Sequence, residues 1–158
     1  MTSDLISRRS LLSAALATGG LAMLGCSAAS ESKPAARPRL VMYKDPNCGC
    51  CGKWGDAARR AGFIVAVADT ADMMALKAKH GVPDALYSCH TSLVGGYVVE
   101  GHVPLAAVKK LLATRPKLKG IAVPGMPVGS PGMEVPGREP DKFEVVGFDA
   151  AGNVRRFA

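Results

Sequence analysis

Short apolar runs and stretches with helical spacing alternate along the chain from Leu40 onward. Residues 40–43 form an apolar run typical of a buried strand, and residues 63–68 form a β-branched run that predicts a second strand. Between these runs, apolar residues recur at helical spacing over residues 52–61, and a glycine follows at the predicted helix end. The face of this helix that we expect to be buried carries Trp54, Ala57, Ala58 and Ala61.

A second helix is predicted over residues 71–80, and a glycine again follows it. Its apolar face is expected to place Met73, Met74 and Leu76 in the core. Strand, helix, strand and helix in this order predict a parallel strand pair joined by a right-handed crossover.

The next segment has the turn chemistry of a hairpin. Residues 91–94 and 97–100 flank a Gly-Gly pair, and Pro104 opens a third helix predicted over residues 105–114. Two strand–helix units followed by a hairpin and a helix predict an α/β protein with a thioredoxin-like fold, in which helices flank a mixed sheet.

The C-terminal part differs in composition. Residues 120–134 are rich in Gly and Pro and contain Met126 and Met133, so we expect a loop without regular structure there. Residues 143–148 and 153–157 are predicted to form a terminal hairpin.

The N-terminus has the pattern of an export signal. Arg8 and Arg9 precede an apolar stretch over residues 11–24, which has the length of a signal h-region and is too short to span a membrane. We therefore expect residues 1–25 to be a twin-arginine signal peptide and the mature protein to be periplasmic. The segment around Cys26 is similar to a bacterial lipobox, and ordinary cleavage after Ala29 stays the alternative.

The remaining chain divides into a tether and one domain. Residues 26–39 are rich in Pro, Ala, Ser and charged residues, which predicts a flexible tether. Residues 40–158 are enough for a single domain with a modest core. If Cys26 is lipidated, the tether links this domain to a membrane anchor.

Charge and aromatic content argue against nucleic acid as a partner. The formal net charge is +7, but the basic residues are scattered and the chain has one Trp. A nucleic-acid-binding domain would be expected to gather its basic residues in a patch. The basic excess is therefore interpreted as a solvated surface.

Three of the five cysteines stand within four positions, at Cys48, Cys50 and Cys51. A thiolate is both a nucleophile and a soft metal ligand, and such crowding has no packing reason. Adjacent cysteines fit poorly around one tetrahedral ion and are strained as a disulfide, which favours a site with more than one metal. Cys48 and Cys51 also stand in the C-x-x-C register, so a redox pair is the alternative.

A fourth cysteine is expected to face this loop. In the predicted fold, the segment entering the hairpin lies opposite the cysteine loop, and it carries Cys89. Thioredoxins usually have a cis-proline at this place, whereas Pro83 lies several residues too early. His90 and His102 are candidate nitrogen ligands or proton carriers. The thioethers of Met126 and Met133 are candidate soft ligands for Cu(I).

Four motifs in this order resemble the CopG family of bacterial periplasmic copper-resistance proteins: residues 43–54, 88–91, 96–104 and 125–134. The resemblance covers nearly all of residues 40–157. It implies a thioredoxin-like fold that binds copper through Cys48, Cys50, Cys51 and Cys89. It also implies a role in copper tolerance, by sequestering Cu(I) or handling its oxidation state.

Two functions follow from these observations. The first is a copper-binding protein whose thiolates bridge Cu(I) ions in a multinuclear site, without conventional enzyme activity but with redox cycling of copper open. Its expected partners are copper ions and periplasmic copper chaperones or efflux components. The second is a thiol–disulfide oxidoreductase that uses Cys48 and Cys51. Zinc fits less well, because closed zinc sites usually take two separate cysteine pairs.

Overall fold

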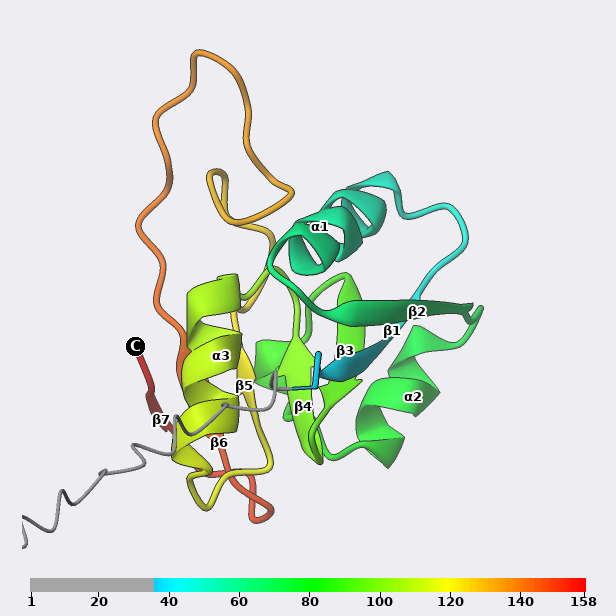
Figure 1. Ribbon diagram of the computed structural model, residues 1–158. Helices are drawn as coiled ribbons and strands as arrows, with labels where there is room; N and C mark the ends of the chain where they lie inside the picture. Colours follow the sequence, from blue (N-terminus) through cyan, green and yellow to red (C-terminus); the bar gives the residue numbers. More distant parts are fainter. Residues whose placement is uncertain (1–35) are drawn as a thin grey trace, which may run out of the picture. The chain divides into compact units, whose positions relative to one another are not determined.

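The computed structural model describes residues 36–158, which form a mixed α/β structure (Figure 1). The predicted signal peptide and nearly all of the predicted tether lie outside these residues. Within residues 36–158, no helix combines the length and the apolar character that crossing a membrane requires. The elements along the chain are β1 (Arg39–Lys44), α1 (Gly49–Arg60), β2 (Ile64–Asp69), α2 (Met73–Lys79), the short 3₁₀ helix η1 (Asp84–Leu86), β3 (His90–Val94), β4 (Tyr97–Glu100), α3 (Leu105–Thr114), β5 (Gly120–Ala122), β6 (Val146–Phe148) and β7 (Val154–Arg156).

The strands form one seven-stranded sheet in the order β2-β1-β3-β4-β5-β6-β7. β1 pairs in parallel with β2, and β4 pairs in parallel with β5. The other four neighbouring pairs are antiparallel. The predicted parallel crossover, the central hairpin and the C-terminal hairpin are therefore confirmed.

Apolar side chains pack on both faces of this sheet. One core cluster joins α1, α3 and the inner strands, and its members include Trp54, Leu111 and Val99. The other cluster includes Leu86 of η1 and Val98 of β4. Because successive residues of a strand point to opposite faces, the neighbours Val98 and Val99 belong to different clusters. The α2–η1 segment therefore covers the face opposite α1 and α3.

Helix α1 begins earlier than its apolar pattern indicated. It starts at Gly49 instead of residue 52, with Cys48 as its N-cap in an extended backbone conformation. Apolar spacing marks only the buried face of a helix, so it does not detect a first turn made of Gly and Cys. Cys50 and Cys51 consequently lie in the first turn of a helix and not in a loop.

Two further predictions of local structure were wrong. Met74 was expected in the core but is 64% exposed, whereas Lys77 occupies the buried position of α2 at 2% exposure. An ion pair with Glu100 turns this side of α2 toward the sheet. Residues 120–134 were expected to lack regular structure, but Gly120–Ala122 form β5, because their buried backbone pairs with β4 and β6.

Candidate metal centre

The start of α1 presents three cysteines at one end of the helix. Cys48 precedes the helix, and Cys50 and Cys51 belong to its first turn. This turn contains no acidic residue, and no side chain caps it. Free N–H groups and the positive end of the helix dipole therefore face the cysteines.

Cys48 and Cys51 are joined by a disulfide, with a Cα–Cα distance of 5.6 Å. This is the C-x-x-C redox pair that the sequence offered as the alternative to a metal site. Cys50 and Cys89 are free thiols of intermediate exposure. The Cys50 Sγ lies 3.5 Å from the Cys48 Sγ, so a free thiol stands directly beside the disulfide.

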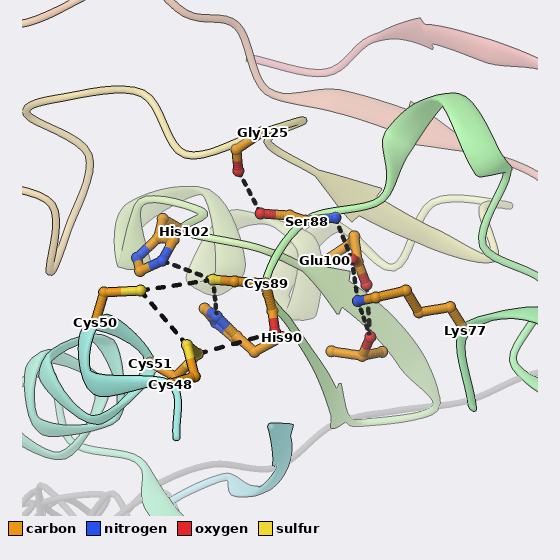
Figure 2. Close-up of polar contacts among 11 residues, drawn as sticks. Cys48, Cys50, Cys51, Lys77, Ser88, Cys89, His90, Glu100, His102 and Gly125 are labelled. Carbon is orange, nitrogen blue, oxygen red and sulfur yellow. Dashed lines mark hydrogen bonds and ion pairs between the residues drawn. A yellow bond between two sulfur atoms is a disulfide. The ribbon is translucent and has the colours of Figure 1, made fainter. Parts of the chain in front are cut away.

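Cys89 reaches this group from the residues that precede β3. Its Sγ lies 4.0 Å from the Cys50 Sγ, and its carbonyl oxygen lies 3.9 Å from the Cys51 Sγ (Figure 2). We call Cys48, Cys50, Cys51 and Cys89 the thiol cluster, since their sulfur atoms all lie within 4.8 Å of one another. The prediction that Cys89 faces the other three cysteines is confirmed.

Two buried histidines also lie beside Cys89. The His102 Nε2 lies 3.0 Å from the Cys89 Sγ, and the His90 Nδ1 lies 3.3 Å from it. The two imidazole rings meet edge to face, with centroids 4.9 Å apart. Cys89, His90 and His102 form a second group whose potential ligand atoms lie within 4.8 Å of one another. Cys89 therefore belongs to both groups.

The tautomer of His102 follows from its hydrogen bonds. Its Nδ1 lies 2.8 Å from the carbonyl oxygen of Pro131, which accepts hydrogen bonds and cannot donate them. The proton is therefore on Nδ1, and the lone pair of Nε2 faces the Cys89 sulfur. In metal sites, a hydrogen bond at one ring nitrogen commonly orients the other nitrogen in this way.

Burial keeps these groups neutral in the absence of metal. It raises the pKa of Cys89 to about 12, and the neighbouring Cys50 adds to this effect. Burial lowers the pKa of His90 well below its ordinary value, and the nearby His102 and Lys77 lower it further. The pKa of His102 is also lowered by burial, although the hydrogen bond to Pro131 opposes the change. A metal ion that binds here must displace the proton of Cys89 but finds the imidazole lone pairs free.

Trp54 supports the histidines from α1. Its ring lies 4.8 Å from the His90 ring, centroid to centroid, and its Nε1 donates to the carbonyl oxygen of Val103 at 2.9 Å. The Nε2 of His90 is buried and has no hydrogen-bond partner within the described residues. An unpaired buried ring nitrogen is unfavourable in itself, so this imidazole is not explained by packing alone.

The two candidate methionines lie in the loop that follows β5. Met126 is 52% exposed and follows Gly125, whose carbonyl oxygen accepts a hydrogen bond from the Ser88 hydroxyl. Met133 is half-buried and stands two residues after Pro131. The loop thus contacts Ser88, which precedes Cys89, and His102, whose Nε2 faces the Cys89 sulfur. Ligation by either thioether stays a prediction.

Several contributors to this site carry no readable sequence signal. The Pro131 carbonyl could not be assigned to His102 before the fold was known, since 29 residues separate them. Ser88 is likewise an ordinary polar residue in the sequence. The sequence held two signs of the Lys77–Glu100 ion pair. They were a basic residue on the predicted apolar face of α2 and an acidic residue in a buried strand.

Comparison with known proteins agrees with this architecture. A family model described as "Protein of unknown function, DUF411" matches residues 86–133. A solved structure titled "Copper resistance protein copG- Form 2" is 45% identical, with a TM-score of 0.73, and the alignment covers 77% of this chain and 97% of that one. The chain belongs to the CopG family. A structure titled "Copper resistance protein copG- Form 1" is 46% identical, with a TM-score of 0.72 and coverage of 76% and 94%. No curated protein matches.

The CopG relationship and the geometry lead to the same residues. The family resemblance implied a site at Cys48, Cys50, Cys51 and Cys89, and these four side chains meet in the fold. The structure adds His90 and His102 to the surroundings of Cys89. The cysteines form a cluster that could hold a metal ion.

Proposed function

We propose that this protein binds Cu(I) in the periplasm through the thiol cluster and thereby contributes to copper resistance. The observation that carries the proposal is the meeting of four cysteine sulfurs from two distant segments within 4.8 Å. Thiolates are soft ligands that suit Cu(I), and a sulfur that bridges two ions allows a compact multinuclear site. Adjacent Cys50 and Cys51 are an advantage in such a site, because each can contact a different ion.

The proposal requires the disulfide to open. Cys48 and Cys51 provide thiolates only after a dithiol reductant has transferred two electrons to their S–S bond and become a disulfide itself. The reduced site then offers four sulfurs, and the start of α1 stabilises those of the first turn as thiolates. Copper binding would therefore depend on the redox state of the chain.

The histidines extend the donor set. The Nε2 of His102 points its lone pair at the Cys89 sulfur, so an ion bound to Cys89 would have a nitrogen donor close by. Imidazole is a borderline ligand that suits copper in both oxidation states. This mixed set supports redox cycling between Cu(I) and Cu(II) as part of the proposed function, with His90 and the thioethers of Met126 and Met133 as further donors.

The fold itself supports a thioredoxin-like assignment. The elements from β1 to α3 follow the order strand, helix, strand, helix, hairpin and helix, and their strands are ordered β2-β1-β3-β4. The cysteines stand at the start of the first helix, and Cys89 stands before the third strand. We interpret β5, the following loop and the terminal hairpin as an addition to a thioredoxin-like unit.

Location and partners belong to the same proposal. The arginine pair at Arg8 and Arg9 supports export by the twin-arginine route, and the lipobox-like segment around Cys26 supports a lipid anchor. In the periplasm, the partners would be copper ions and the chaperones or efflux components that deliver or remove them.

One observation favours a second function. The Cys48–Cys51 disulfide has the register of a thiol–disulfide oxidoreductase, and the free Cys50 lies beside it. In that function the reduced pair would transfer two electrons to a substrate disulfide, which would become a dithiol as Cys48 and Cys51 re-form their disulfide.

A Cu(I) titration of the reduced protein without oxygen tests the first function. We expect more than one Cu(I) per wild-type chain against a competing chelator, and a loss of affinity of at least about 100-fold in Cys89→Ser, because even indirect ligand partners affect metal affinity by about 10- to 100-fold. Cys26→Ser is the matched control, since it makes the same replacement outside the thiol cluster. Unchanged binding in a folded Cys89→Ser protein contradicts the proposed site. A copper-free wild type that reduces insulin supports the second function.

A further inference from the structure

A buried ion pair lies behind the thiol cluster. Lys77 of α2 and Glu100 of β4 place Nζ and Oε1 2.5 Å apart, and their side chains are 3% and 0% exposed. Two charges lose their hydration at such a depth, and buried ion pairs are often no more stabilising than apolar residues of similar size. Stability alone therefore does not explain why this pair is present.

The carboxylate of Glu100 has further partners that lead toward Cys89. Its Oε1 accepts a hydrogen bond from the Ser88 backbone N–H at 2.7 Å, and its Oε2 accepts one from the Thr91 hydroxyl at 2.6 Å. The Lys77 Nζ also donates to the Thr91 hydroxyl oxygen at 3.0 Å. Glu100 thus holds the chain on both sides of Cys89 and His90 (Figure 2).

Ser88 connects this network with the loop after β5. Its hydroxyl donates to the carbonyl oxygen of Gly125, while its backbone N–H donates to Glu100. Ser88 lies outside the strand ladder, because β3 begins at His90. Sheet pairing therefore holds the chain on the His90 side of Cys89, whereas the Glu100 side chain holds it on the Ser88 side.

The ion pair and the histidines belong to opposite faces of the sheet. Thr91 and Glu100 are direct partners across β3 and β4, so their side chains share the α2 face. His90 precedes Thr91 and packs against Trp54 of α1 on the other face. The ion pair is consequently not part of the proposed ligand set, although it holds the segment that carries Cys89.

We propose that Glu100, held by Lys77, is a positioning residue that fixes Cys89 in the thiol cluster through the Ser88 N–H. The use of the cluster for copper rests on the proposed function, but the placement of Cys89 does not. Apolar residues at positions 77 and 100 would fill the space of the ion pair but leave the Ser88 N–H without its acceptor. An amide at position 100 would keep an oxygen for this N–H without the charge.

Two double variants separate positioning from packing. Lys77→Met with Glu100→Gln retains an acceptor for Ser88, whereas Lys77→Met with Glu100→Leu does not. The rate of maleimide labelling at Cys89 is measured by mass spectrometry on the full chain without metal, with the disulfide intact and Cys50 as the internal reference. We expect the Gln variant to stay within about threefold of wild type, since a side-chain oxygen still accepts from Ser88. In the Leu variant we expect labelling of Cys89 to rise at least about tenfold relative to Cys50, since loss of this acceptor releases the segment.

Equal Cys89 labelling rates in two folded double variants would overturn the proposal. Hydrogen exchange of the wild-type Ser88 amide provides a test that does not depend on the variants folding. We expect this amide to be protected as strongly as the paired amides of β3, and exchange at the rate of an exposed amide would also overturn the proposal. Copper titration distinguishes a failure of this proposal from a failure of the proposed function. If the wild type binds no copper, the proposed function fails, but the labelling rates still test how Cys89 is positioned.

Discussion

Replacing Gly132 by alanine is a sharp test of how the loop after β5 is held against the site. Gly132 has a φ of +86°, and a Cβ added there would lie 2.8 Å from the Trp54 backbone nitrogen and 3.2 Å from the Lys53 carbonyl carbon. These neighbours belong to the backbone of α1 and cannot turn aside as a flexible side chain would. Gly132 follows Pro131, whose carbonyl oxygen accepts from His102, so a shift of the loop reaches the site.

Gly125→Ala is the matched control, because Gly125 has a φ of +68° but no heavy atom within 4 Å of an added Cβ. A left-handed conformation costs alanine about 1–2 kcal/mol, and the smaller entropy of the unfolded chain returns about 0.4–1 kcal/mol. We therefore expect Gly125→Ala to lower the free energy of unfolding by about 0.5–1 kcal/mol. In Gly132→Ala the close contact adds about 1–3 kcal/mol, which gives a total of about 1.5–4 kcal/mol.

Urea unfolding followed by tryptophan fluorescence measures both values, because Trp54 is the single Trp of the chain and lies in the core. An equal loss of stability in the two variants would refute the close packing of the loop on α1. In Gly132→Ala, we also expect weaker Cu(I) binding than in Gly125→Ala, since His102 loses the carbonyl that orients it.

Three other predictions concern single groups. Burial lowers the pKa of His90, so as the pH falls below the ordinary value near 6.5 the unfolded chain binds a proton that the folded chain does not. His90 should therefore reduce the stability of the metal-free protein by about 1.4 kcal/mol for each pH unit of acidification in this range, and His90→Phe should remove this contribution in urea unfolding. Met126→Ala should weaken Cu(I) retention only modestly compared with the exposed control Met74→Ala, because a neutral thioether can leave thiolate-bound copper; complete loss of copper would contradict this. Cys26→Ser should move the protein from the membrane fraction to the soluble periplasm, and a wild type that is already soluble would refute lipidation.

Much of the fold was predictable because it rests on local patterns. Apolar runs, helical spacing and turn residues located β1, β2, α3 and both hairpins, since these signals are read from neighbouring residues of the chain. Residues 105–114 matched α3 at both ends. The same logic failed for the start of α1, whose first turn consists of Gly and Cys, and for β5, whose strand pairing depends on neighbours distant in sequence.

The candidate site was likewise predictable only in part. Crowding of thiols and the order of elements were enough to predict that Cys89 meets Cys48, Cys50 and Cys51, because the crossover connection leaves few places for these segments. The sequence left open which thiols pair, and the fold joins Cys48 with Cys51. His90 and His102 were candidates only by their proximity in sequence to Cys89 and to the second hairpin strand.

By itself, the sequence determined the order of the elements from β1 to α3 and the four cysteines of the candidate site, because these follow from local patterns, and the resemblance of its motifs indicated the family. Only the tertiary structure decided how the groups around Cys89 are held. The Pro131 carbonyl that orients His102 and the Glu100 carboxylate that holds Ser88 come from distant parts of the chain. Their contacts require a packed sheet and a docked loop, since hydrogen bonds act only over about 3 Å and no sequence pattern encodes that distance.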